Sequence, residues 1–148
     1  MSRSRLVEML TRHEGRRALV YRCSAGHLTI GVGRNVDPDG GGYGLSSEEM
    51  DFMLENDIIR HHKELYNAFP WYRDLDEVRQ EALIDMHFMG HPAFCGFKRM
   101  IKALEDGDYK KAHDEALDSK WAREDVQKDR STEISMMLWT GKYQPNAS

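Results

Sequence analysis

Three side chains that could do chemistry lie near the start of the sequence: the carboxyl group of Glu14, the thiol of Cys23 and the hydroxyl of Thr29. Eight residues separate the first from the second, and five separate the second from the third. A carboxyl group that keeps its proton beside apolar walls can act as a general acid. The spacing alone leaves plainer alternatives open: an exposed helix-end glutamate, a cysteine that only packs in the interior and a threonine that only favours a strand.

The residues on either side of Glu14 predict a short helix followed by a β-hairpin. Apolar residues recur three and four positions apart before Gly15, a residue that suits the position just after a helix end. Two β-rich runs, LVYRC and HLTIGVG, lie between residues 19 and 33 and are joined by a Ser/Gly turn. A hairpin that folds back on the helix end can bring Glu14, Cys23 and Thr29 to one side, at the edge of a crevice between lobes.

Beyond the hairpin, the sequence predicts a loop and then a series of helices. The stretch DPDGGGYG at residues 37–44 combines turn formers with glycines and ends the β-rich region. Ser46 and Glu49 have the spacing of a capping box at the start of a long helix. Apolar periodicity predicts further helices near residues 78–86, 97–104 and 109–121, and a last one from about Val126 to Gly141.

Together these elements predict an α+β fold, with a small N-terminal β-hairpin lobe set against a larger all-helical lobe. A length of 148 residues suits one domain with one sizeable core. We expect a single domain over residues 1–148, with the β lobe at about 16–44 and the helical lobe formed by 1–15 and 45–148.

Composition and charge exclude several classes of protein. Apolar residues make up 40% of the chain and no stretch approaches the ~18 apolar residues of a membrane span, so we expect a soluble protein without stable membrane insertion. The sequence contains no basic helix with interleaved aromatic residues, so we expect no nucleic-acid binding. Cys23 and Cys95 are too few and too far apart for a disulfide framework. His61 and His62 are adjacent and cannot share a helix face, so we expect no metal and no cofactor.

The stretch HEGRRALVYRCSAGHLTIGVGR, from His13 to Arg34, resembles the catalytic region of the phage-type, T4-lysozyme-like endolysins of glycoside hydrolase family 24. That family has a Glu, eight residues, an Asp or Cys, five residues and a Thr, with TIGxG closing the hairpin. The resemblance continues at LDEVRQEALIDMHFMG, CGFKRM, GDYKKAHDEALDSKWARE and MMLWTGKY, so it covers essentially the whole chain. It implies a lysozyme-like fold.

The resemblance also implies a reaction. The protein would be a muramidase that hydrolyses the β-1,4 bond between N-acetylmuramic acid and N-acetylglucosamine in bacterial peptidoglycan. Glu14 would protonate the leaving oxygen, and Cys23 would stand where the best-known members have an aspartate. We interpret Cys23, as a thiolate or a hydrogen-bonded thiol, as helping Thr29 to hold the attacking water, which implies inversion.

Four further positions match substrate-binding residues of the family. Gly33 lies in TIGVG, Phe88 and Phe97 match aromatic residues beside the cleft, and Arg130 matches an arginine that faces the catalytic glutamate. The two phenylalanines also suit a packed core, because they are apolar residues on helices.

The resemblance further implies an ion pair between the two lobes. Arg34 replaces a residue that is histidine in the best-known relative, and Asp57 on the long helix occupies the matching partner position. We interpret the pair as structural.

Three other functions stay open at this point. A lytic transglycosylase also uses a glutamate but forms an anhydro product, a thiol amidase or peptidase could combine Cys23 with His13 or His27, and a wall-binding module would have no turnover. The first residues lack the features of a secretory signal. By family analogy, a monomer would accumulate in the cytoplasm of the host bacterium and reach the wall in the periplasm through a membrane lesion made by a holin.

Overall fold

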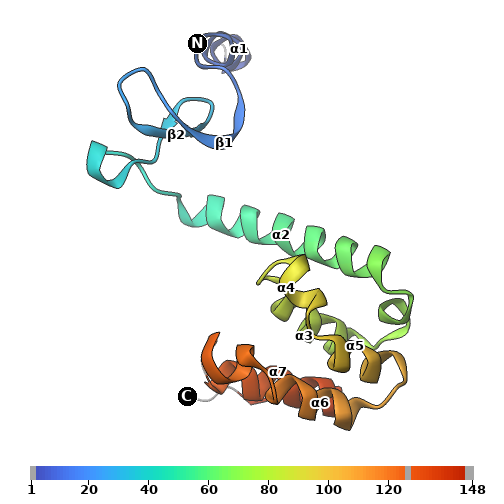
Figure 1. Ribbon diagram of the computed structural model, residues 1–148. Helices are drawn as coiled ribbons and strands as arrows, with labels where there is room; N and C mark the ends of the chain where they lie inside the picture. The colour runs from blue at the N-terminus through green and yellow to red at the C-terminus, as the bar shows by residue number, and fades with distance from the viewer. Residues whose placement is uncertain (1–2, 126–127, 146–148) are drawn as a thin grey trace. The chain divides into compact units, whose positions relative to one another are not determined.

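The computed structural model describes residues 3–125 and 128–145 and has the α+β fold that the sequence predicts (Figure 1). The chain divides into two compact units, an N-terminal unit over Met1–Phe52 and a helical unit over Met53–Ser148. Val126, where we expected the last helix to begin, lies outside the described residues. Across the described ranges, no helix combines the length and hydropathy that a membrane span requires.

The N-terminal unit begins with one helix and a three-stranded sheet. Helix α1 spans Arg3–Glu14, and strands β1, β2 and β3 span Arg17–Arg22, Leu28–Gly31 and Arg34–Asn35. The sheet is antiparallel in the order β1-β2-β3, with Tyr21 opposite Thr29 and Ile30 opposite Arg34. The predicted hairpin is therefore confirmed. The third strand was not predicted, because two residues are too few to show an alternating pattern.

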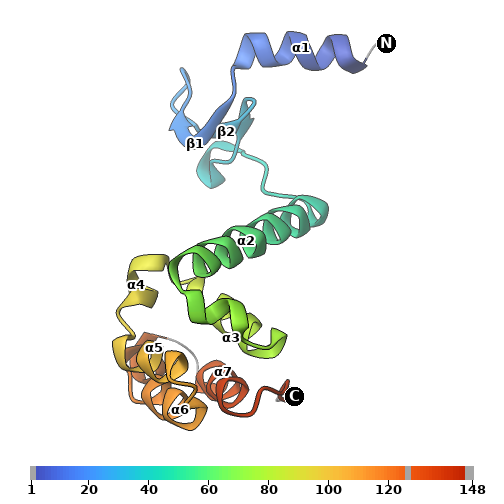
Figure 2. The same cartoon turned by 90° about the vertical axis from the view of Figure 1, so that its right-hand side faces the viewer.

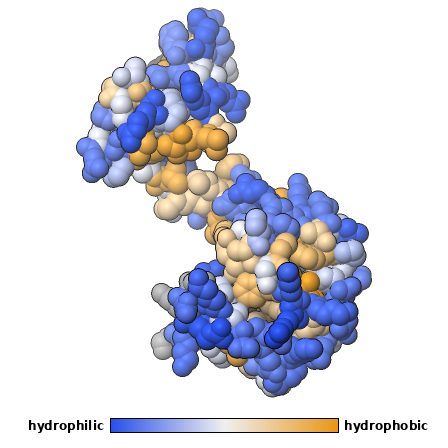
Figure 3. Space-filling view, viewed as in Figure 1, coloured by the Kyte–Doolittle hydropathy of each residue, from blue (hydrophilic) through white to orange (hydrophobic). Residues whose placement is uncertain are grey.

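The N-terminal unit holds few buried side chains. Thr29 is the one buried residue within the described range 3–52, whereas Leu19 and Val20 on β1 are exposed. Figure 3 shows exposed apolar surface, in orange, on the part of the molecule that holds the sheet. Backbone hydrogen bonds and turns therefore stabilise this sheet more than apolar burial does.

The predicted loop and the start of the long helix are confirmed. Residues Pro38–Gly40 form a single 3-10 turn capped by the Asp37 carboxylate, which accepts a hydrogen bond from the Asp39 N–H at 3.1 Å. Helix α2 spans Ser47–Ala68. Its first turn has the capping box: the Glu49 N–H donates to Ser46 Oγ at 3.1 Å, and the Ser46 N–H donates to Glu49 Oε1 at 2.8 Å.

The helical unit contains the rest of α2 and five shorter helices. Helices α3, α4, α5, α6 and α7 span Glu77–His87, His91–Cys95, Lys98–Glu105, Tyr109–Leu117 and Lys128–Thr140. A 3-10 turn at Pro70–Asp74 precedes α3, and a π-helical turn at Trp121–Asp125 follows α6. Helix α4 was not predicted, since five residues give too short a periodicity. The cap of α6 is confirmed, because the Asp108 carboxylate accepts the Lys111 N–H at 3.1 Å.

The apolar core lies in the helical unit. Helices α5, α6 and α7 pack side by side and α3 packs on α7, as Figures 1 and 2 show. Fully buried side chains meet there from α2 to α7, among them Leu65, Leu83, Phe94, Met100 and Leu138. This unit therefore has the apolar packing that stabilises a folded body by itself.

Candidate active site

Glu14 and Gly33 lie in contact within the N-terminal unit. Helix α1 ends at Glu14 because the next residue, Gly15, has a φ of +75°. Gly33 has a φ of +71° in the turn between β2 and β3. A methyl group on its α-carbon would lie 2.7 Å from Glu14 Oε2, closer than side chains can approach. The carboxyl group of Glu14 therefore occupies the space that the absent side chain of Gly33 leaves.

Cys23, at the start of the turn between β1 and β2, and Thr29, on β2, come together at this end of the hairpin. The Cys23 N–H donates to the His27 carbonyl at 2.9 Å, and the Thr29 hydroxyl donates to the same carbonyl at 2.8 Å. Hydrogen bonding with the backbone of His27, and next of Ala25, lowers the pKa of the Cys23 thiol, and the Thr29 hydroxyl contributes further to the lowering. Cys23 is a free cysteine, and its thiolate is more abundant at neutral pH than that of an ordinary cysteine.

His27 and Asp37 connect this turn to the following loop. Asp37 accepts the Leu28 N–H at 3.3 Å, and this bond is the main reason that its pKa is lowered. His27 Nδ1 lies 3.9 Å from Asp37 Oδ2, and the His27 ring lies against Gly40. The interactions of the Cys23 thiol are with backbone groups and Thr29, whereas those of the His27 ring are with the loop. This arrangement differs from the thiol–imidazole pair that a cysteine peptidase needs.

Arg34 and Asp57, which we expect to pair with each other, each have an ion-pair partner within their own unit. Arg34 Nη1 lies 2.5 Å from Glu49 Oε2, in the first turn of α2, and Asp57 binds Arg60 one turn along its own helix. The loop from 36 to 46 returns the chain so that Glu49 lies beside β3. Glu49, on the same unit, is therefore a partner of Arg34, and the expected pair with Asp57 joins the two units and stays a prediction.

Phe88, Phe97 and Arg130 line one pocket of about 890 Å³ in the helical unit. Phe88 is 42% exposed, so it is not a core residue, whereas Phe97 is partly buried and makes an edge contact with Trp121. Arg130 binds Asp85: its Nε donates to Asp85 Oδ1 at 2.8 Å and its Nη2 donates to the Asp85 carbonyl at 3.1 Å. The pocket thus has aromatic walls and a cation fixed at one side.

The structure groups the sequence-predicted site residues by unit. Glu14, Cys23, Thr29 and Gly33 belong to the N-terminal unit, and the three pocket residues belong to the helical unit. The contact that we expect between Arg130 and Glu14 joins the two units and stays a prediction. The roles of all seven residues also stay predictions.

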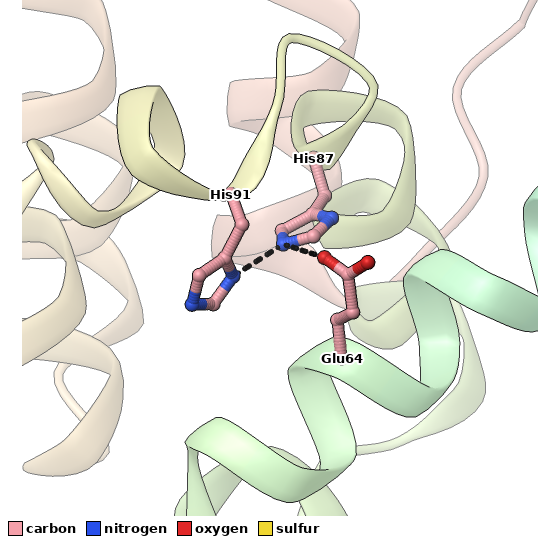
Figure 4. Close-up of side chains that lie close together, drawn as sticks. All are labelled: Glu64, His87 and His91. Carbon is pink, nitrogen blue, oxygen red and sulfur yellow. Dashed lines mark hydrogen bonds and ion pairs between the residues drawn. The ribbon is translucent and has the colours of Figure 1, made fainter. Parts of the chain in front are cut away.

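Sequence reasoning missed one cluster of chemically active side chains in the helical unit. Glu64, His87 and His91 place one donor atom each within 4.8 Å of one another (Figure 4). The signal was the spacing of His87 and His91, four residues apart as in many helical metal sites.

A small sheet that follows a helix-end glutamate, together with a separate helical unit, defines the class of α+β, lysozyme-like proteins. The family model described as phage lysozyme matches residues 11–132, which is most of the chain. The protein belongs to the phage lysozyme family.

Two relatives agree with this membership. The pre-baseplate central spike protein Gp5 of Enterobacteria phage T4 is 26% identical over 164 residues, which cover 94% of this chain and 28% of the spike protein. The probable T4-type lysozyme 1 of Dictyostelium discoideum is 26% identical over 164 residues, which cover 93% of this chain and 95% of that protein. The chain thus spans about a quarter of the first relative and nearly all of the second.

Proposed function

We propose that the protein is a muramidase that hydrolyses the β-1,4 bond between N-acetylmuramic acid and N-acetylglucosamine in bacterial peptidoglycan. Membership of the phage lysozyme family supports this reaction class, and the family match includes Glu14, Cys23 and Thr29. Glycoside hydrolysis needs one group that protonates the leaving oxygen and a second that acts on the opposite face of the sugar. The N-terminal unit supplies candidates for both.

Glu14 is the proton donor of this proposal. It is the last residue of α1 and an exposed side chain whose carboxyl group lies against Gly33. The backbone of Gly33 restricts the positions that the Glu14 carboxyl group can take on that side, because the backbone of a turn is stiffer than a long side chain. A proton donor must be held within hydrogen-bond reach of the bridging oxygen, so this contact serves its positioning.

Cys23 and Thr29 hold the attacking water. The single observation that carries the proposal is that one short turn brings the Cys23 thiol and the Thr29 hydroxyl together. A thiolate can accept a proton from water and oppose the positive charge that develops on the sugar ring, as the usual aspartate would. The lowered pKa of Cys23 makes that ionised form more available. Attack on the face opposite to Glu14 inverts the anomeric carbon.

Replacement of Glu14 by glutamine tests the proposal directly. Glu14→Gln removes the proton but keeps the shape, so release of reducing ends from purified peptidoglycan should fall at least about 100-fold. Glu8→Gln is the matched control, because Glu8 is an exposed residue of the same helix that pairs with Arg12, and it should keep the parent rate. Full activity of Glu14→Gln would refute the acid role.

The chemistry of the products distinguishes the competing reactions. Mass spectrometry of the released fragments should find N-acetylmuramic acid with a reducing end, one water heavier than the anhydro form that a lytic transglycosylase makes. Release of amines without new reducing ends would instead identify an amidase. Proton NMR of the first product should show inversion at the anomeric carbon.

A further inference from the structure

The cluster of Glu64, His87 and His91 joins three helices of the helical unit. Glu64 lies on the second half of α2, His87 is the last residue of α3, and His91 is the first residue of α4. Gly90, with a φ of +107°, turns the chain between the two histidines, whose ring centroids lie 5.0 Å apart. Figure 4 shows the Glu64 carboxylate and the His91 ring approaching the same nitrogen of His87.

The distances in this cluster are close to those of a metal site. His87 Nε2 lies 2.8 Å from His91 Nδ1 and 3.8 Å from Glu64 Oε2. Ligand atoms that are each about 2.1 Å from a tetrahedral zinc ion lie roughly 3.4 Å apart, so these two pairs need a change of only about 0.5 Å, and the third pair, His91 with Glu64, lies within 4.8 Å. Small side-chain rotations can make this change, and the exposed Glu64 is free to move.

In His87 and His91, the ring nitrogen that does not face the cluster, here called the outer nitrogen, already has a partner. His87 Nδ1 is hydrogen bonded to His61 Nδ1 at 2.7 Å, and His91 Nε2 lies 3.4 Å from Cys95 Sγ. In metal sites, the second ring nitrogen of a ligating histidine usually makes such a bond, which fixes the tautomer and the direction of the ring. This second layer of contacts distinguishes the cluster from a chance meeting of exposed side chains.

The short distance between the two facing histidine nitrogens also suits a bound cation. In the empty cluster one proton must lie between His87 Nε2 and His91 Nδ1, because two lone pairs at this distance repel each other. A metal ion can replace that proton as the shared partner. The ring that held this proton changes tautomer and carries it on its outer nitrogen, so each ring has a single N–H on the outer side, towards His61 or Cys95, and both rings remain neutral imidazoles.

We propose that Glu64, His87 and His91 bind one divalent transition-metal ion of the zinc type, which fastens α2 to α3 and α4. Imidazole nitrogens favour zinc, copper and nickel over magnesium and calcium, whose usual ligands are oxygen atoms. His87 is fully buried, whereas Glu64 is exposed and leaves an entry path for the ion and for water. The role is structural, because three helices without a covalent link gain one common anchor.

Zinc titration of the full, untagged chain tests this site. Calorimetry with Zn²⁺ should show one ion per chain, and saturating Zn²⁺ should raise the midpoint of thermal unfolding by on the order of 5 °C, with no effect of Mg²⁺. Glu64→Gln and His91→Ala should each weaken Zn²⁺ binding by at least about tenfold. Glu55→Gln is the matched control, because Glu55 is an exposed glutamate of the same helix, and its affinity should equal that of the parent.

The result of each variant either supports or overturns the site. Weaker binding in both ligand variants, with the control unchanged, supports it. Failure to bind Zn²⁺, or an unchanged affinity in either ligand variant, overturns it. Loss of binding in Cys23→Ala, with no loss in Glu64→Gln, would place the ion on the N-terminal unit and would also overturn it. Circular dichroism of the metal-free variants checks that each is folded.

Discussion

Alanine at Gly33 should reduce activity more than alanine at Gly31. Both glycines have a φ of +71°, so an alanine at either position meets the same backbone strain of about 1–2 kcal/mol. Their surroundings differ. A Cβ at position 33 would lie 2.7 Å from Glu14 Oε2 and 2.8 Å from Glu14 Cδ, whereas among the described residues nothing lies within 4 Å of a Cβ at position 31.

The size of the effect follows from how far the Glu14 carboxyl group must move. An ordinary carbon–oxygen contact is about 3.3 Å, so the new methyl group pushes the carboxyl group away by roughly 0.6 Å. A displacement of about 1 Å at a reacting group costs on the order of 100-fold in rate. We therefore expect Gly33→Ala to lower kcat by roughly 10- to 30-fold relative to Gly31→Ala.

Steady-state release of reducing ends from peptidoglycan, with kcat and KM measured separately, gives the comparison. Urea unfolding of both variants checks that their stabilities have fallen by similar amounts, since the backbone strain is shared. Equal kcat values at equal stability would refute the reasoning, because the displaced carboxyl group would then be irrelevant to the reaction.

Three further predictions concern other parts of the molecule. Alkylation of Cys23 by iodoacetamide, followed by peptide mass spectrometry, should have its midpoint below the ordinary pKa of 9.0, because backbone hydrogen bonds lower the pKa of the thiol; a midpoint at or above 9.0 contradicts this. The pKa of Asp37 is lower in the folded than in the unfolded protein, so its stabilisation is complete above about pH 4 and is lost as the pH falls further. In urea unfolding at a series of pH values, Asp37→Asn should therefore reduce the fall in the free energy of unfolding below about pH 4. An unchanged fall would count against this role. Leu83 is fully buried and Leu54 is half exposed; Leu83→Ala should lower the free energy of unfolding by about 2–5 kcal/mol and Leu54→Ala by about 0.5 kcal/mol at most, and similar losses would contradict the assigned core.

Sequence reasoning predicted the features that neighbouring residues decide. The helix that ends at Glu14, the capping box at Ser46 and the Asp108 cap each depend on residues within four positions, and the structure confirms them. The same reasoning missed β3 and α4, with two and five residues, because elements this short have no readable period. Their formation depends on the strand or helix that each one meets.

Partners that lie far apart in the sequence were harder to predict. The ion pair between Arg34 and Glu49 was not predicted, because it forms only when the loop after β3 returns the chain to Glu49. The cluster around His87 was missed, since Glu64 lies on another helix and the sequence shows only the spacing of the two histidines. Family resemblance supplied the roles of Glu14, Cys23 and Thr29, and spacing alone left those roles open.

The sequence by itself determined the order of the longer elements, several of their ends and the family, because these depend on local preferences and on a motif that can be read along the chain. Only the tertiary structure decided that Gly33 lies under the Glu14 carboxyl group, that Thr29 lies beside the Cys23 thiol and that Glu64 faces two histidines. Such contacts form between side chains that the backbone brings together after it has turned, and the path of the folded chain sets their distances.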